Sequence, residues 1–483
     1  MREVKILVVG AGFSGLCSGI KFKQAGIDDF VILEKASDLG GTWRANTYPG
    51  AECDIPSALY SYSFEHNAQW EFKWSGQAQI LQYQRDTSSK YGLHTHINYD
   101  QEVVNARFDA SAQRWVIESR DGTQYLAQHF VCAVGQLDKP FTPQLPNAES
   151  FDGAAFHSAQ WDHSVDFSNK RVAVIGNAAS AVQLIPEVAK IAQQVTVYQR
   201  TPNWVLAKFD RPYARWEQQA SAKFGCLTKA YRWCLWGLGE YVVLPAINGK
   251  AWAQWFVTKL CLRNLHKNVK SAELRAKLTP NYPVGAKRVL FSDHYYPALE
   301  RDNVILNIDG VRELSHKGVV DNAGHTEFAD IVVYATGFIT NPFLADIHVA
   351  GLDGQTIRQA WRDGAQAYLG MSTAGFPNLH LLYGPNTNLG HTSVIIMFEA
   401  QADYIIRAIS YLDHQGLQSL EVKHEVEELY NIKLQQRLAA TAFSSIEQSW
   451  YKVGAKITTN WPGGTREYRK RLKEIDWQAY TLK

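Results

Sequence analysis

The sequence lacks the charge excess that would direct it to a polyanion. Its 49 Lys and Arg residues are nearly balanced by 47 Asp and Glu residues, which leaves a net charge of +2. A protein that binds the phosphate backbone of nucleic acid needs many more uncompensated cations. No block of like charge is long enough to form an interaction tail either. We therefore expect no nucleic-acid partner.

Long apolar runs are also missing. The aromatic and aliphatic stretch 231–244 contains Arg232 and Glu240 and meets Pro245, so it falls short of the about 20 apolar residues that cross a bilayer. The N-terminal apolar run 6–9 leads at once into a glycine motif and is too short for the core of a signal peptide. These absences predict a cytoplasmic protein without a membrane span.

Paired cysteines are a third absence. The six cysteines form no C-x-x-C pair and have no metal-ligand spacing with histidine, so we expect reduced, buried thiols and no metal site. The composition is otherwise ordinary, with 46% hydrophobic and 20% charged residues in a chain of 483. Such a chain can form several domain-sized units with large cores.

A dinucleotide-binding pattern stands at the N-terminus. The apolar residues 6–9 predict a buried strand, and a GxGxxG motif with glycines at Gly10, Gly12 and Gly15 follows directly. These glycines permit a tight turn, close approach of a pyrophosphate and tight helix packing, with the phosphates at a helix N-terminus. We expect that helix to end near Gln24.

An acidic residue completes this first unit. The apolar residues 30–33 predict a second strand that leads to Glu34, 24 positions after Gly10. A carboxylate at the tip of that strand accepts hydrogen bonds from a ribose diol. The ligand is therefore expected to be FAD or NAD, without a 2′-phosphate.

The region after residue 100 has a β pattern. Residues 115–117 and 125–126 predict a hairpin with a type I′ turn at Asp121-Gly122, and residues 130–134 predict a further strand. Three prolines between positions 140 and 146 then predict an extended connector, where we place a domain boundary.

The strand and glycine turn occur a second time. Residues 171–175 predict a buried strand, and the segment from Gly176 to Ala181 repeats the turn. Ala178 stands where the middle glycine lets a pyrophosphate approach most closely, so we expect looser phosphate binding, which suits a cofactor that moves or leaves.

Arg200 distinguishes the second unit from the first. It lies 24 positions after Gly176, the offset that Glu34 has from Gly10. An arginine there can pair bidentately with a 2′-phosphate, which predicts NADPH, whereas the alternative is a solvated arginine at a strand end.

Residues from about 205 to 280 are rich in aromatic residues and compatible with helices, and we interpret them as a helical insertion. Trp252, Phe256 and Leu260 recur at helical spacing. That spacing favours a face buried in the core over a substrate-binding stripe.

The segment after Glu34 resembles a known family. Gly40-Gly41-Thr42-Trp43, Tyr48-Pro49-Gly50 and Asp54 are similar to the stretch that lies along the flavin in flavin-containing and Baeyer-Villiger monooxygenases. Related disulfide reductases carry a redox cysteine pair at this place, but Cys53 has no nearby partner, so dithiol chemistry is not expected. Asp54 has a second interpretation, as a helix N-cap before Ile55-Pro56.

A second stretch makes the resemblance specific. Phe151, Gly153, His157, Trp161 and Asp162 match the FxGxxxHxxxW(P/D) fingerprint of type I Baeyer-Villiger monooxygenases with every spacing kept. We expect this stretch to link the two nucleotide units without carrying out chemistry, with Gly153 allowing a bend. Residues 335–337 and 384–391 extend the resemblance, which runs from residue 6 to about 400.

The resemblance implies an α/β fold with two Rossmann-like dinucleotide-binding domains, one for FAD and one for NADPH. The FAD-binding domain would comprise residues 1–145 and 338–483, the latter including the C-terminal loop region. The NADPH-binding domain would comprise residues 146–337, with the helical insertion at about 205–280.

The resemblance also implies site residues. Arg288 would be the catalytic arginine, stabilising the anion of a flavin C4a peroxide and its ketone adduct, and Asp54 would position it. The remaining implied cofactor contacts are Gly10, Gly12, Gly15, Glu34, Thr42, Trp43, Asp54, Tyr60, Val103, Asn388 and Leu389 in the first domain and Gly176, Asn177, Ala178, Ser180, Arg200, Thr201 and Lys287 in the second.

The implied reaction inserts one oxygen atom of O2 beside a ketone carbonyl, giving an ester or lactone. Three alternatives stay open: a monooxygenase of sulfides or amines, for which Arg288 would be dispensable; an NADPH oxidase that releases hydrogen peroxide; and a non-catalytic redox sensor. His391 is expected to have no chemical role. Whether it packs near the flavin edge or elsewhere stays open. Residues 449–451 resemble the start of a mobile loop over NADP, but the usual continuation is absent.

Overall fold

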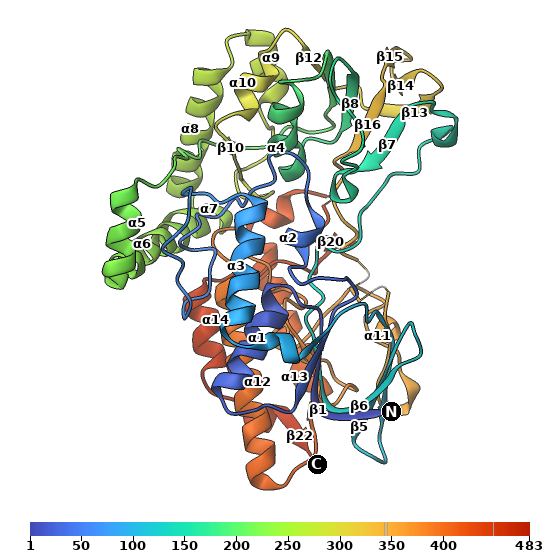
Figure 1. Ribbon diagram of the computed structural model, residues 1–483, viewed down its shortest axis with the longest axis vertical. Helices are drawn as coiled ribbons and strands as arrows, with labels where there is room; N and C mark the ends of the chain where they lie inside the picture. Colours follow the sequence, from blue (N-terminus) through green and yellow to red (C-terminus); the bar gives the residue numbers. More distant parts are fainter. Residues whose placement is uncertain (342, 345, 448) are drawn as a thin grey trace.

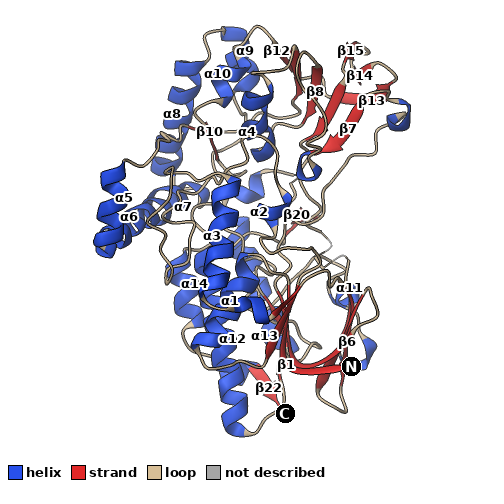
Figure 2. Ribbon diagram, viewed as in Figure 1, coloured by secondary structure: helices blue, strands red, loops and turns tan. Residues whose placement is uncertain are grey.

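Two separate β-sheets carry the fold, one in the lower half of Figure 1 and one in the upper half. The computed structural model describes residues 1–341, 343–344, 346–447 and 449–483. Helices pack around both sheets, and a group of helices forms the left edge of the view (Figure 2). The predicted α/β architecture with two nucleotide-binding sheets is confirmed.

The first sheet begins with a strand-helix-strand unit. β1 (Arg2–Val9) and β2 (Phe30–Leu33) run parallel and are joined by α1 (Phe13–Gln24), which ends where the sequence predicts. The sheet order is β17-β4-β5-β6-β1-β2-β3, with β18 beside β6. The other strands are β3 (Ile97–Asn98), β4 (Val103–Asp109), β5 (Arg114–Ser119), β6 (Gln124–Cys132), β17 (His348–Ala350) and β18 (Leu379–Leu381).

The predicted hairpin is present, with two differences. β5 and β6 pair antiparallel, but β6 is one strand that contains the predicted segment 125–126 and continues into the predicted strand 130–134, ending at Cys132. The turn is not type I′, because Gly122 has a positive φ of 84° while Asp121 does not. The extra residues of this loop remove the need for two left-handed positions.

Helices from both ends of the chain cover the first sheet. α1 packs against α12 (Ile395–Gln415), and the buried residues of α12 recur along most of its length. The remaining elements of this half are α2 (Thr42–Ala45), α3 (Gln77–Lys90), α11 (Ile357–Ala360), α13 (His424–Ala439), α14 (Thr465–Leu472), β19 (Leu420–Val422), β20 (Lys452–Val453), β21 (Lys456–Ile457) and β22 (Tyr480–Leu482).

The second sheet is parallel throughout. Its order is β12-β9-β8-β16-β7, and α4 (Ala179–Val188) follows β8. The strands are β7 (Ala154–His157), β8 (Arg171–Ile175), β9 (Gln194–Tyr198), β12 (Val304–Asn307) and β16 (Ile331–Tyr334). A three-stranded antiparallel sheet of β13 (Val311–Ser315), β14 (Gly318–Asp321) and β15 (Thr326–Phe328) lies beside them in Figure 1.

The predicted helical insertion is confirmed. It lies between β10 (Val205–Leu206) and β11 (Leu290–Phe291), which pair with each other. Its helices are α5 (Arg215–Lys223), α6 (Gly225–Leu238), the π-helical turn η4 (Gly239–Val243), α7 (Leu244–Ile247), α8 (Ala251–Asn268) and α9 (Ala272–Leu278); α10 (Tyr295–Leu299) follows β11.

The predicted core face of α8 is wrong. Trp252, Phe256 and Leu260 are 58%, 42% and 38% exposed, whereas Val257 and Cys261 are buried. Both sets have the same helical spacing, one residue apart. The face with the smaller side chains, Val257 and Cys261, packs against α7 and β10. The large aromatic side chains therefore remain on the outside.

The thiols also differ from the prediction in part. All six cysteines are free, but Cys226 and Cys234 are exposed. Both are on α6, which lies at the edge of the molecule (Figure 2). Among the described residues, no cluster of His, Cys, Asp and Glu is suited to a metal ion. No described helix is long and apolar enough to cross a membrane.

Candidate active site

The two glycine turns have the same backbone geometry. Gly10 and Gly176 have φ values of 102° and 113°, which favour glycine, and a Cβ at either would collide with the carbonyl oxygen of Ala133 or Ala335. In the described structure, α1 and α4 have no side-chain cap and no acidic residue in their first turns. Their N–H groups can therefore bind phosphates, so both turns fit a dinucleotide.

Glu34 is held beside the first turn. Its carboxylate is buried and accepts hydrogen bonds from the backbone N–H of Ala11 at 2.8 Å and of Ala36 at 3.0 Å. These bonds fix the carboxylate at the end of β2, where a ribose diol of a bound FAD would lie.

The segment expected along the flavin is folded against the first turn. The Gly40 N–H donates to the Ala11 carbonyl at 3.0 Å, and α2 begins at Thr42. The Trp43 indole donates to the Tyr60 hydroxyl at 3.0 Å. These contacts bring Thr42, Trp43 and Tyr60 together.

The other residues expected on the flavin side lie in two places. Val103 is buried at the start of β4, and Leu389 is buried in the loop before α12. The Asn388 side chain accepts from the Tyr383 hydroxyl at 2.6 Å and donates to Asn460 at 2.7 Å. Asn388 is thus fixed within the C-terminal part of the chain.

A cationic site lies at the end of β9. The Lys287 ammonium donates to the Thr201 hydroxyl at 3.1 Å, and the Asn177 amide donates to the Thr201 carbonyl at 2.8 Å. Burial and the charge of Arg200 both lower the pKa of Lys287. Within the part of the chain that the structure describes, neither cation meets a carboxylate. Two uncompensated cations and a hydroxyl fit a phosphate group.

Ala178 and Ser180 lie at the start of α4. Ala178 occupies the N-cap position with an extended backbone, as Gly12 does before α1. Ser180 is partly buried in the first turn. A methyl group therefore projects at the place where the first unit has only backbone.

Arg288 and Asp54 form an ion pair between the two halves. The Arg288 Nη2 lies 2.7 Å from the Asp54 Oδ1. Burial alone would lower the pKa of Arg288, but Asp54 together with Cys53, Tyr383 and Tyr451 outweighs it, so the pKa is raised and the guanidinium stays charged. The described residues 54–76 form bends, turns and bridges, so the interpretation of Asp54 as a helix N-cap is wrong.

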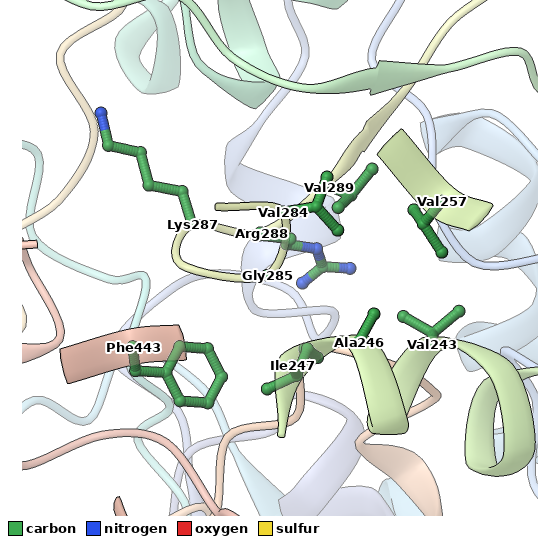
Figure 3. Close-up of a pocket in the computed structure, with 11 residues that line it drawn as sticks. Val243, Ala246, Ile247, Val257, Val284, Gly285, Lys287, Arg288, Val289 and Phe443 are labelled. Carbon is green, nitrogen blue, oxygen red and sulfur yellow. The ribbon is translucent and has the colours of Figure 1, made fainter. Parts of the chain in front are cut away.

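An apolar pocket surrounds Arg288. Figure 3 shows its guanidinium directed toward the pocket centre, while Lys287 points away toward the cationic site. The lining residues are Val243, Ala246, Ile247, Val257, Val284, Gly285, Val289, Gly390 and Phe443. The backbone N–H of Arg288 also donates to the Tyr451 hydroxyl at 3.2 Å. Apolar side chains therefore surround a permanent positive charge.

A second ion pair was not predicted from the sequence. The Lys208 Nζ lies 2.5 Å from the Glu52 Oε1 and 3.2 Å from the Cys53 carbonyl oxygen, with 2% of the Lys208 side chain exposed. Burial raises the pKa of Glu52. Gln183 on α4 accepts from the Tyr48 hydroxyl at 2.8 Å. The segment that ends at Asp54 is thus attached to the second half at several points, which no sequence spacing indicates.

The fingerprint lies outside the pocket, on the edge strand β7 and the segments on either side of it; β7 pairs with β16. Gly153 lies at a bend directly before β7, as predicted, although its φ is not positive; a Cβ there would collide with the Asp330 carbonyl and the Phe151 ring. Burial lowers the pKa of His157, whose ring centroid lies 5.8 Å from that of Phe338. A neutral, buried histidine packed against Phe338 supports a structural role for His157.

Two more fingerprint residues, Trp161 and Asp162, stabilise the loop after β7. The Trp161 ring stacks on Phe167 with centroids 5.1 Å apart. Asp162 accepts from the Ser164 N–H at 2.9 Å and its hydroxyl at 2.6 Å, which closes a local turn. Neither residue lines the Arg288 pocket.

His391 pairs with a glutamate of the insertion. Its Nε2 lies 3.3 Å from the Glu240 Oε1, and both side chains are buried. Burial alone would raise the pKa of Glu240, but hydrogen bonds from His391 and Thr465 outweigh it and the pKa is lowered. Thr465 begins α14, so this carboxylate ties η4 to two C-terminal segments. Trp450, in the predicted loop, is 41% exposed.

Comparisons with known proteins agree with this geometry. The family model described as pyridine nucleotide-disulphide oxidoreductase matches residues 7–215. The whole chain is 39% identical to a Baeyer-Villiger monooxygenase of Pseudomonas aeruginosa, of which it covers 92%, and 38% identical to one of Streptomyces coelicolor, of which it covers 93%.

Solved structures show the same fold. Cyclohexanone monooxygenase from Rhodococcus sp. Phi1 bound to NADP+ has a TM-score of 0.89 and 26% identity, over 100% of this chain and 99% of that chain. The OTEMO complex with FAD and NADP has a TM-score of 0.89 and 26% identity, over 99% of each chain. The two nucleotide-binding sheets therefore correspond to an arrangement that holds both cofactors.

Proposed function

The chain belongs to the Baeyer-Villiger monooxygenase family of FAD- and NADPH-dependent flavoproteins, and we propose that it oxidises an apolar ketone in the pocket beside Arg288. The observation that carries this proposal is the Arg288–Asp54 ion pair at an apolar pocket. When bound, FAD supplies the reaction with O2 and NADPH supplies the hydride. One oxygen atom enters the ester or lactone, and the other leaves as water with the oxidation of one NADPH.

Arg288 stabilises negative charge on the reacting oxygen. A guanidinium remains protonated, and a charge fixed beforehand in an apolar pocket costs no reorganisation during the reaction. Asp54 orients the guanidinium through the 2.7 Å contact. The aliphatic wall, which includes Val243, Ile247 and Val257, excludes water and accepts the hydrocarbon part of the ketone.

The domain division is also a proposal. Residues 1–145 and 338–483 bind FAD, because β17 and β18 complete the first sheet although they follow the second in sequence. Residues 146–337 bind NADPH. FAD contacts are assigned to Gly10, Gly12, Gly15, Glu34, Thr42, Trp43, Asp54, Tyr60, Val103, Asn388 and Leu389, and NADPH contacts to Gly176, Asn177, Ala178, Ser180, Arg200, Thr201 and Lys287.

We place the reaction in the cytoplasm. Six unlinked cysteines are typical of a reducing compartment, and NADPH is available there. Osmotic shock of expressing bacteria should release none of the enzyme, whereas recovery in the shock fluid would contradict this location.

A substrate panel tests the proposal. Linear, cyclic and aromatic ketones, with a sulfide as comparison, should be incubated with NADPH and the products identified by mass. Wild-type enzyme should add one oxygen atom to at least one ketone. Oxidation of the sulfide alone would favour heteroatom chemistry, and hydrogen peroxide in the same amount as consumed NADPH would favour an oxidase.

A further inference from the structure

Helix α8 presents aromatic and basic side chains to solvent. Trp252 and Trp255 are 58% and 60% exposed, and Phe256 lies beside them on the same face. Lys259 and Arg263 continue this face toward the C-terminal end of the helix and are exposed. The Lys259 ammonium lies 4.3 Å from the centroid of the Trp255 ring. This face combines apolar rings with cations.

Helix α6 and the turn after it have a similar outer side. Leu227, Trp233, Leu238 and Tyr241 are all at least half exposed. Figure 1 shows α6 and α8 at the same edge of the molecule, away from both sheets. Large apolar side chains grouped on one exposed region are uncommon in a monomer that has no binding surface there.

The charges of this region are almost all positive. Residues 218–272 contain a single acidic residue, Glu240, which is buried. The same residues contain the exposed cations Lys223, Lys229, Lys250, Lys259, Arg263, Lys267 and Lys270, while Arg232 is buried. The chain as a whole has nearly equal numbers of acidic and basic residues, so residues 218–272 have a local excess of positive charge. Two copies of this surface would repel each other, which disfavours a dimer through it.

We propose that the outer face of α6 and α8 docks on an anionic lipid surface. Tryptophan and tyrosine prefer the interface between lipid and water, and lysine and arginine can pack their stems on apolar groups while their charges meet lipid phosphates. Aromatic residues beside basic ones on an amphipathic helix are typical of interfacial binding. This docking needs no helix that spans the bilayer.

The same helix also reaches the pocket. Val257 lines the pocket from the buried face of α8, opposite the exposed rings. In a docked enzyme, this wall of the pocket lies one helix diameter, roughly 10 Å, from the lipid. If the proposed function holds, this geometry favours ketones that partition into membranes as substrates; this step rests on the proposed function.

Vesicle co-sedimentation tests the docking without any catalytic step. The FAD-loaded enzyme should bind vesicles that contain phosphatidylglycerol, bind pure phosphatidylcholine vesicles much more weakly, and dissociate at high salt. The triple change Lys259→Gln, Arg263→Gln and Lys267→Gln should weaken binding on the order of a hundredfold, since each cation near an anionic surface contributes separately. Matched changes at Lys433, Lys470 and Lys473, which are exposed elsewhere, should leave binding unchanged.

The aromatic side chains are tested by Trp252→Ser, Trp255→Ser and Phe256→Ser together. This variant should keep its FAD and its NADPH oxidation rate and lose vesicle binding. Equal binding to both kinds of vesicle, or full binding by either triple variant, would overturn the proposal. A wild-type enzyme that binds no vesicles would also overturn it. If light scattering then shows that the wild type is a dimer and the aromatic variant a monomer, the face binds a second copy of the chain instead.

Discussion

The two nucleotide units share one backbone and differ in a few side chains. Each has a left-handed glycine: Gly10 packs against Ala133, the residue after β6, and Gly176 packs against Ala335, the residue after β16. At equal offsets from these glycines, the first unit has Glu34 and the second has Arg200. We infer that the backbone provides phosphate binding in general and that a single charge at the strand end selects the nucleotide.

Reversing the charge of the first unit should have the largest effect. Glu34→Arg removes the acceptor for the Ala11 and Ala36 N–H groups and buries a cation beside the glycine turn. The variant is expected to purify without FAD, as measured by absorbance. Glu34→Gln, which keeps an acceptor, should retain part of the FAD; full FAD in both variants would remove Glu34 from the site.

Neutralising the second unit should change nucleotide preference. Arg200→Ala should lower the ratio of kcat/KM for NADPH over NADH by about ten- to a hundredfold, the value of a charge-assisted hydrogen bond of roughly 1.5–3 kcal/mol. Lys287→Ala should lower it less, because Lys287 is partly buried and its pKa is lowered by Arg200. An unchanged ratio in Arg200→Ala would contradict the assignment.

The contact between the units can be weakened away from Arg288. Lys208→Ala leaves the partly buried Glu52 carboxylate without its partner and should lower the free energy of unfolding by about 2 kcal/mol. The double variant Lys208→Met and Glu52→Gln removes both charges and should be closer to wild type in a denaturant titration. Equal losses in both variants would show that the ion pair does not stabilise the contact.

Restoring glycine in the second turn should have the smallest effect. Ala178→Gly removes the methyl group at the N-cap of α4 and makes the turn resemble that of Gly12. The Kd for NADP+ should fall a few-fold, measured by fluorescence titration, with FAD content unchanged. A weaker affinity would indicate that the alanine favours binding by stiffening the turn.

The sequence predicts the nucleotide units well because their residues are close in the chain. The offset from Gly10 to Glu34 and the end of α1 depend on local geometry alone. The contact between Asp54 and Arg288 joins positions 234 apart, so only the family resemblance suggests it. The pair of Glu52 with Lys208 has no such signal and was missed.

The insertion shows a different limit. Helical spacing identifies the helix but not the side that packs, since two adjacent faces of α8 have apolar residues at the same spacing. The face with Val257 packs because its small side chains fit against neighbouring helices. The face with Trp252 remains exposed. Tertiary packing therefore overrides the preference for burying the larger residues.

The role of Arg288 is tested most directly by measuring flavin reduction and ester formation separately in Arg288→Ala. Rapid mixing with NADPH should show flavin reduction close to the wild-type rate, because the cationic site at Arg200 and Thr201 is intact. Ester formation should fall by about a hundredfold or more, the usual effect of removing a charge that stabilises a developing anion. Normal flavin reduction with normal ester yield would contradict the account.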